Sequence, residues 1–407
     1  MDKIAQEVDE LYKANFGKIV ASLLYASSSI DPETAEDLVQ DSFASALTDW
    51  KQNGVPSNKV GWIYKVSKNK ALNRIKRDKR VEALSERTKV ESFELRFSDS
   101  ATNDQQLTLL FACAHPDLSP KSQVVITLKY VLNLKVDAIA KALCMTIDGI
   151  DKLLFRARQK IKEERILLRE SHALALIPRL PIVHKIIYLT FNEGYKSLSN
   201  DQILRNELCE EALLLNKALL DSSLANKDTL ALYALMLFNS ARFESRFSAT
   251  GDLLDLEQQD RSLWNQDLIF MASDFLRKSK DDAASSYHLE AAIACVHCTS
   301  RSFESTDWRT ITGLYARLLK DYPSPFIELN YAIALYYYGD KESAFSILNE
   351  LQRHPFLSQY YLLNSALGKL HRLEGNVVLA RQYLVKALDQ THLTKERAFI
   401  QRTINEL

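Results

Sequence analysis

The sequence predicts an all-α protein built from several helical domains. Apolar residues recur at helical spacing along most of the chain. Only 10 Gly and 9 Pro in 407 residues leave few positions for hairpins and tight turns. The composition, 46% hydrophobic and 26% charged, is that of domains that bury a core. A chain of this length is expected to form about two to four such domains.

The composition also excludes several classes of protein. No run approaches the roughly 18 apolar residues that span a bilayer, and the start, MDKIAQEVDELYKANF, is typical of an acidic amphipathic helix rather than a signal peptide. We therefore expect a cytoplasmic protein with no membrane partner. Five cysteines, an odd number, do not make a disulfide framework, so reduced thiols are expected.

Charge is strongly segregated although the formal net charge is zero. The first fifty residues hold ten acids against three lysines, whereas residues 61–80, GWIYKVSKNKALNRIKRDKR, hold eight basic residues against Asp78. Two neighbouring segments of opposite charge favour two differently charged partners that are met side by side.

The N-terminal helices can be placed in order. Residues 8–27 have helical apolar spacing, and a second helix over 29–50 begins with Asp31 as N-cap and Pro32 in the first turn. A loop, residues 51–59, separates it from a basic helix over 61–80. That helix has one apolar stripe, formed by Trp62, Ile63, Val66, Leu72 and Ile75.

The basic helix has two readings. A run of charge is usually a solvated face. Here, however, Asn69 and Asn73 alternate with the lysines and arginines, and Trp62 and Tyr64 offer stacking surfaces, which suits a DNA strand that is being opened as well as a duplex.

A polar linker over 81–106 leads to a second helical block over 107–165. We expect an apolar helix over 118–134, a short helix over 135–143, a turn at 144–146 and a long helix over 147–164, which is helix-turn-helix spacing. Any helical hairpin can show this pattern, and two acids near the start of the long helix would repel phosphate. The exposed candidates are Thr146, Ile147, Asp148, Asp151, Lys152, Phe155 and Arg156.

Beyond residue 165 the pattern predicts helix after helix, and an internal repeat lies near the end. Breaks are expected near Pro178 and Pro181 and at 192–200, 248–251, 300–306 and 322–325. Residues 324–351 align with 360–388 at an offset of 36, which pairs small residues and a turn glycine. Tetratricopeptide-like helix pairs, of period about 34, have this pattern.

No enzyme or metal motif emerges. CVHC, residues 295–298, has redox or zinc spacing, but no second pair of ligands follows, which favours core cysteines over a metal. No phosphate loop, HExxH or GxSxG is present. We expect no catalytic residue, no cofactor and no metal.

An acidic helix, a loop, a basic helix, a linker and a helix-turn-helix, in that order, resemble RNA polymerase sigma factors of the extracytoplasmic-function (ECF) type. AEDLVQDSFASAL resembles region 2.2 of that family, residues 61–80 resemble regions 2.3 and 2.4, and residues 118–163 resemble region 4. The stretches LIPRLPIVHKIIYLTFNEGY and LEQQDRSLW resemble the long C-terminal extension of one ECF subgroup, which ends in tetratricopeptide-like repeats.

The resemblance implies site residues. Core RNA polymerase would be bound by residues of the acidic helix, namely Glu36, Asp37, Gln40, Asp41 and Phe43. The loop would capture a base flipped from the −10 element, and loop and basic helix together would bind that element through Asn53, Ser57, Asn58, Trp62, Lys65, Lys68, Asn69, Asn73, Arg74 and Arg77. Promoter DNA at −35 would meet Thr146, Asp148, Asp151, Lys152, Phe155 and Arg156.

We therefore expect a non-enzymatic sigma factor that recognises −35 and −10 elements, starts promoter melting and is regulated by its extension. Its repeats would dock within the chain or on a protein partner. The alternatives are a helix-turn-helix transcription regulator with a repeat-type sensor and a protein-interaction scaffold. The expected domains are 1–80, 81–106 as linker, 107–165, 166–300 and 301–407.

Overall fold

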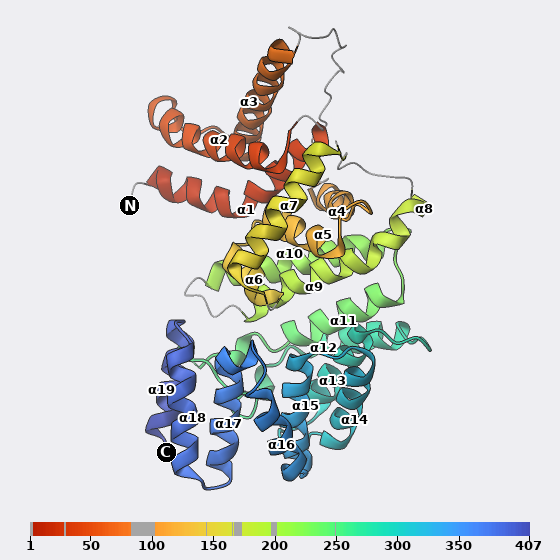
Figure 1. Ribbon diagram of the computed structural model, residues 1–407, viewed down its shortest axis with the longest axis vertical. Helices are drawn as coiled ribbons and strands as arrows, with labels where there is room; N and C mark the ends of the chain where they lie inside the picture. Colours follow the sequence, from red (N-terminus) through yellow and green to blue (C-terminus); the bar gives the residue numbers. More distant parts are fainter. Residues whose placement is uncertain are drawn as a thin grey trace. The chain divides into compact units, whose positions relative to one another are not determined.

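The computed structural model describes residues 3–27, 30–82, 102–143, 145–164, 166, 173–196, 202–248 and 250–407 (Figure 1). These residues form helices and loops, with one isolated β-bridge between Phe247 and Leu253, so the all-α prediction is confirmed. The chain divides into two compact units, one of residues 1–194 with 206–224 and one of residues 195–205 with 225–407. Within the described ranges, no helix has the length and apolar character that a membrane span needs.

The first unit opens with three helices that all pack on one another: α1 (Lys3–Ala26), α2 (Pro32–Asn53) and α3 (Lys59–Glu82). The predicted N-cap of α2 is confirmed, because the Asp31 side chain accepts a hydrogen bond from the Thr34 amide at 2.9 Å. Trp50 and Ile63 are fully buried between the helices. α3 begins two residues before the predicted start at residue 61.

A second group of helices follows: α4 (Thr102–Cys113), α5 (Pro120–Ile126), α6 (Val136–Ala142) and α7 (Ile147–Glu163). The predicted apolar helix over 118–134 is wrong in detail, since α5 widens into a π-helical turn, Thr127–Val131, and ends there. The predicted linker 81–106 is helical at both ends, where α3 stops and α4 starts. Its middle, residues 83–101, and Cys144 of the predicted turn lie outside the described residues.

The same unit contains α8 (Ala173–Leu176), a 3-10 turn (Ile177–Arg179), α9 (Leu180–Lys196) and α10 (Gln202–Asp221). The break expected near Pro178 is confirmed, whereas α9 continues to Lys196, past the start of the break expected at 192–200. Residues 197–200 lie outside the described part. Buried Arg179 donates to the Phe111 carbonyl at 2.8 Å, and Gln106 donates to Glu211, so this part of the chain is anchored on α4.

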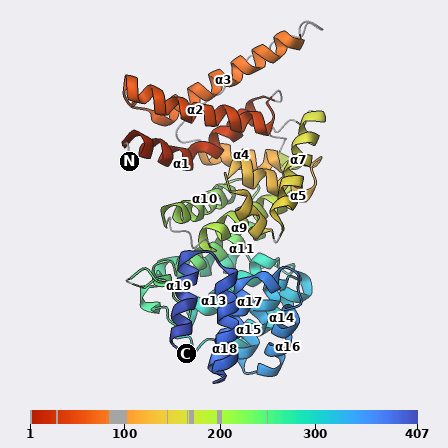
Figure 2. The same cartoon turned by 60° about the vertical axis from the view of Figure 1, so that its left-hand side comes forward.

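The second unit is a succession of helices, most of which pack on the next along the chain (Figure 2). They are α11 (Lys227–Ser240), α12 (Gln266–Lys278), α13 (Ser286–Thr299), α14 (Trp308–Asp321), α15 (Pro325–Tyr338), α16 (Lys341–Leu351), α17 (Tyr361–Leu373), α18 (Val377–Gln390) and α19 (Thr394–Asn405). The loops expected near 248–251, 300–306 and 322–325 are present in the described residues.

The two copies of the sequence repeat fold as two helix hairpins, α15–α16 and α17–α18. Each hairpin turns at a glycine with positive φ, 109° at Gly339 and 73° at Gly375, a conformation that favours glycine. The equivalent alanines Ala344 and Ala380 are fully buried. The offset of 36 seen in the sequence therefore corresponds to two similarly built hairpins.

Candidate nucleic-acid and protein interface

The outer face of α2 carries the acidic residues named from the sequence. Ala35, Val39 and Ala46 are buried, so they mark the side of α2 that packs against the neighbouring helices. Asp37, Gln40 and Asp41 are exposed, and they lie within one and a half turns of each other. This face is therefore a compact, accessible surface with two carboxylates and an amide.

Two residues of the named set are placed differently. Phe43 is only 3% exposed and packs against Tyr12 with ring centroids 5.0 Å apart, so it belongs to the domain core and does not present its ring to a partner. Glu36 is half-buried and pairs with Lys129 of the π-helical turn at 2.8 Å. The expectation from the sequence that Phe43 belongs to the polymerase-binding surface is therefore corrected, because its side chain is buried in the domain core.

The Glu36–Lys129 ion pair belongs to a wider contact between the two helix groups. Arg158 of α7 lies 3.4 Å from Glu33 of α2. Gly17 of α1 approaches the π-helical turn so closely that a Cβ there would lie 2.3 Å from the Val131 carbonyl oxygen. Burial raises the pKa of Tyr130 in the same turn to about 12. Sequence patterns gave no sign of this long-range contact.

The loop between α2 and α3 is exposed and is held by its own polar side chains. Gly54 ends α2 with φ 85°. Asn53 donates to Asp49 at 2.8 Å, and Asn58 accepts from the Gly61 amide at 2.8 Å and so caps α3. Ser57 is exposed. Two of the three named loop residues thus shape the loop as well as lining it.

α3 presents a basic face along its length. Ile63, Ser67 and Ala71 are buried. The exposed residues of α3 that were named from the sequence are Lys65, Asn69, Asn73, Arg74 and Arg77. Four of them recur at intervals of four residues, which places them on one side of the helix. In Figures 1 and 2 the C-terminal half of α3 projects beyond α1 and α2.

Two other named residues of α3, Trp62 and Lys68, are half-buried. Trp62 packs edge-on against Trp50 with centroids 5.6 Å apart. Lys70, which was not named, donates to the Asp41 carbonyl at 2.7 Å and to Ser45 Oγ at 3.0 Å, and so ties α3 to the acidic helix. These three side chains help to fix where the exposed face of α3 lies.

α6 and α7 form the predicted helix-turn-helix. Thr146 caps α7 by accepting from the Gly149 amide at 3.1 Å, and Ile150, Leu154 and Ala157 bury one side. The opposite side is exposed, with Ile147 at 54% and Phe155 at 61%. Asp151 and Arg156 are exposed too.

The charge of this helix start is partly balanced within the helix. Asp148 pairs with Lys152 at 2.7 Å, one turn along, and both side chains are exposed. The first of the two acids that opposed a phosphate contact is thus matched by a lysine, and an exposed helix with an apolar and basic surface remains.

The CVHC cysteines lie on α13. Cys298 is buried and donates to the Phe238 carbonyl at 3.6 Å, and burial raises its pKa to about 11. Cys295 is half-buried, and burial raises its pKa also. Among the described residues no group of three or more His, Cys, Asp or Glu is placed to hold a metal. Cys298 is thus a core residue.

Comparison with known proteins agrees with this geometry. Residues 12–81 match sigma-70 region 2, residues 108–161 match sigma-70 region 4, and residues 179–280 match a family of unknown function, DUF6596. No solved structure matches the chain. The exposed acidic helix, the basic helix and the helix-turn-helix all lie within the first two matches, which define an RNA polymerase sigma factor.

Two relatives extend the comparison. The chain is 30% identical over 383 residues to an uncharacterized protein of Rhizobium meliloti (strain 1021), which covers 92% of this chain and 90% of that protein. It is 25% identical over 182 residues to RNA polymerase sigma factor YlaC of Bacillus subtilis (strain 168), which covers 42% of this chain and 99% of YlaC. The chain therefore contains the two sigma-70 domains and belongs, over nearly its whole length and with the extension included, to the same family as the Rhizobium protein.

The two sigma-70 domains give the broad function. Sigma factors are non-enzymatic subunits that bind core RNA polymerase and promoter DNA during transcription initiation. Region 4 supplies the DNA-binding helix-turn-helix.

Proposed function

We propose that the protein is an ECF-type sigma factor whose two neighbouring faces divide the work. The exposed face of α2, Asp37, Gln40 and Asp41, binds core polymerase, and the exposed face of α3 binds the −10 element. The observation that carries the proposal is that two adjacent helices of the sigma-70 region 2 match present opposite charge outward. Exposed carboxylates steer a basic partner, whereas lysines and arginines neutralise phosphates.

At the −10 element the loop and α3 have different roles. Lys65, Arg74 and Arg77 grip the phosphates, and Asn69 and Asn73 offer amides that pair with base edges. The loop of Asn53, Ser57 and Asn58 receives a base flipped from the duplex, whose unstacking costs a few kcal/mol that the loop contacts must offset. Half-buried Trp62 and Lys68 support this surface from α3.

At the −35 element α7 enters the major groove by its N-terminal turns. Thr146, Lys152 and Arg156 bring hydrogen-bond donors, and Phe155 brings an apolar surface for a thymine methyl group. Asp148 either keeps its ion pair with Lys152 or accepts a hydrogen bond from a cytosine amino group. Asp151 is assigned only the hydrogen bond from a cytosine amino group. Because a sigma factor acts on chromosomal DNA, the proposed compartment is the cytoplasm.

The C-terminal extension is proposed to control the sigma domains and to be of the tetratricopeptide type. The two hairpins α15–α16 and α17–α18, with their equivalent glycine turns and buried alanines, support the second point. A repeat array offers a surface for a protein or for another part of this chain. The promoter-binding domains and the controlling element then belong to one polypeptide.

The decisive experiment measures association of the purified full chain with core RNA polymerase, followed by transcription from a library of promoter-like DNA. We expect stable association and initiation at one shared motif, and loss of association by at least tenfold for Asp37→Lys with Asp41→Lys. The matched control reverses two exposed acids of the second unit, Asp282→Lys with Glu350→Lys, and should associate as the wild type does. Equal association of the two double variants contradicts the assignment of the α2 face.

A further inference from the structure

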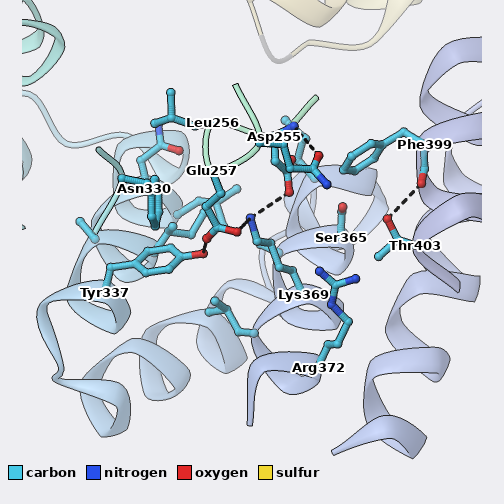
Figure 3. Close-up of a pocket in the computed structure, with 18 of the residues that line it drawn as sticks. Asp255, Leu256, Glu257, Asn330, Tyr337, Ser365, Lys369, Arg372, Phe399 and Thr403 are labelled. Atoms are coloured by element: carbon cyan, nitrogen blue, oxygen red, sulfur yellow. Dashed lines mark hydrogen bonds and ion pairs between the residues drawn. The ribbon is translucent and has the colours of Figure 1, made fainter. Parts of the chain in front are cut away.

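The second unit contains a cavity of about 350 Å³ between its repeat helices and the loop that precedes α12 (Figure 3). One wall is aromatic, because Trp308 and Tyr337 stack with centroids 4.9 Å apart and Phe303 packs edge-on against both. The other wall is polar and comes from α17 and α19. Family membership assigns no role to this cavity.

The polar wall is rich in cations. Lys369 and Arg372 of α17 and Arg402 of α19 line the cavity, with Glu406, the residue directly after α19, as the acid on this wall. The two arginines share Glu406, at 3.4 Å from Arg372 and 3.9 Å from Arg402. The helices by themselves therefore present a surface with an excess of positive charge.

A non-helical segment of the chain, Asp252–Gln258, lies against this surface, and we name it the acidic strap. Lys369 binds two of its three carboxylates, Asp255 at 2.8 Å and Glu257 at 3.1 Å. Tyr337 also donates to Glu257. Figure 3 shows Lys369 pointing between the two acids, with Tyr337 reaching Glu257 from the other side.

Backbone contacts complete the arrangement. Arg402 donates to the Leu253 carbonyl at 2.9 Å and lies 3.7 Å from the Asp252 carboxylate. Basic side chains of α17 and α19 thus hold a non-helical segment by a carbonyl and three carboxylates. Charge complementarity between wall and strap shows what chemistry the wall accepts.

The strap is held at the surface rather than in the core. Among the described residues from Arg246 to Leu263, none is buried, whereas Ser245 and Trp264 on either side are. The ion pairs that hold it are partly exposed, with side-chain exposure of 23% for Lys369 and 34% for Asp255. Partly exposed ion pairs contribute little to stability and weaken with salt, so a competing carboxylate can replace those of the strap at low cost.

We propose that the basic groove of α17 and α19 is a binding site for an acidic, non-helical peptide segment of a partner protein, and that the acidic strap occupies it as an internal competitor. The incoming carboxylates take the places of Asp255 and Glu257 on Lys369. Its backbone carbonyl takes the place of Leu253 on Arg402, and its apolar side chains enter the cavity beside Trp308 and Tyr337. This partner is additional to polymerase and DNA.

The test uses the full chain and a labelled peptide with the sequence of the strap, DLLDLEQ, in fluorescence anisotropy. The strap is first disarmed with Asp255→Asn and Glu257→Gln, which keep its shape and remove its charge. We expect this variant to bind the peptide at least tenfold more tightly than the wild type, because the internal competitor is weakened. Binding should fall with added salt.

Two controls decide the result. A peptide whose three carboxylates are replaced by amides should bind the disarmed variant at least tenfold more weakly. Lys369→Met in the disarmed variant should abolish binding, whereas Lys320→Met, at an exposed lysine of α14, should not. Absence of peptide binding to the disarmed variant, or equal binding of the acidic and amide peptides, overturns the proposal. The comparison of the acidic and amide peptides needs no lysine variant, so it tests the proposal even if Lys369→Met fails to fold. Neither assay contains polymerase, so the result does not depend on the proposed sigma-factor function.

Discussion

Gly368 lies at the crossing of α17 and α18, where a Cβ would lie 2.6 Å from Leu384 Cγ and 3.2 Å from the Ala380 carbonyl oxygen. Gly368→Ala should lower the free energy of unfolding of the second unit by about 1–3 kcal/mol, because the added methyl overpacks the crossing. Gly313→Ala is the matched control, since nothing lies within 4 Å of a Cβ there, and it should raise stability by about 0.5–1 kcal/mol. Thermal unfolding followed by circular dichroism checks both, and equal shifts would contradict the crossing.

His297 should make the second unit sensitive to acid. Burial, with the nearby charges of Arg242 and Arg261, lowers its pKa to about 3 from an ordinary 6.5. Between pH 6.5 and 3 this histidine is therefore protonated in the unfolded chain and neutral in the folded chain. Its contribution to the free energy of unfolding is fully present above pH 6.5 and is lost progressively as the pH falls toward 3. Between pH 7.5 and 5 the loss from this group is about 2 kcal/mol.

The measurement compares urea unfolding of the wild type and of His297→Gln at both pH values. Glutamine does not titrate, so the variant should lose about 2 kcal/mol less than the wild type between them. An identical loss in the two proteins would show that other groups cause the acid sensitivity.

On the scale of an element, α3 combines the proposed DNA face with a side that packs on α2. Lys65→Gln should weaken promoter binding by the polymerase holoenzyme at all sequences and lower the slope of log K against log salt by about 1, because one phosphate contact is lost. Lys70→Gln should leave that slope unchanged and lower stability instead, since Lys70 binds Asp41 and Ser45 of α2. Equal salt-dependence slopes for the two variants would contradict the proposed contact between Lys65 and a DNA phosphate.

Elements specified by local chemistry were predictable from the sequence. Asp31 and Pro32 start α2, and Gly339 and Gly375 turn the hairpins, because capping and positive φ depend on the residue itself. The π-helical turn after α5 was not predictable, since it lies against Gly17, more than a hundred residues earlier in the chain. The π-helical conformation therefore depends on tertiary packing and not on the local sequence.

The site divides in the same way. The exposed residues of α3 follow from helical spacing alone. Phe43 shares a region of the sequence with the acids of α2, and only its contact with Tyr12 and Phe16 shows that it turns inward. The acidic strap was missed because Asp255 and Lys369 are 114 residues apart, and no periodicity links them.

On the scale of the whole molecule, the compact units place the better truncation point after Leu224 and not close to the predicted domain boundary at 165–166. Residues 179 and 211 bind α4 through Arg179–Phe111 and Gln106–Glu211. Deleting 225–407 should leave a first unit that unfolds cooperatively, whereas deleting 170–407 should lower its melting temperature by several degrees, as about 1–3 kcal/mol is lost with these contacts. Calorimetry of the two truncated chains distinguishes the cuts.

The shorter deletion also tests control by the extension. Removal of 225–407 should change promoter-dependent transcription while the first unit still binds polymerase. Unchanged output across a set of promoters would show that the extension does not regulate the sigma domains.

The Glu36–Lys129 and Glu33–Arg158 pairs have a kinetic consequence. We propose that polymerase also recruits Glu36, next to the exposed face of Asp37, Gln40 and Asp41, and this carboxylate can bind polymerase only after its ion pair with Lys129 of the π-helical turn opens. Encounter then becomes a two-step process in which opening precedes capture. In stopped-flow mixing, the observed rate should rise with polymerase concentration and then level off at the opening rate, and Lys129→Gln should raise that plateau.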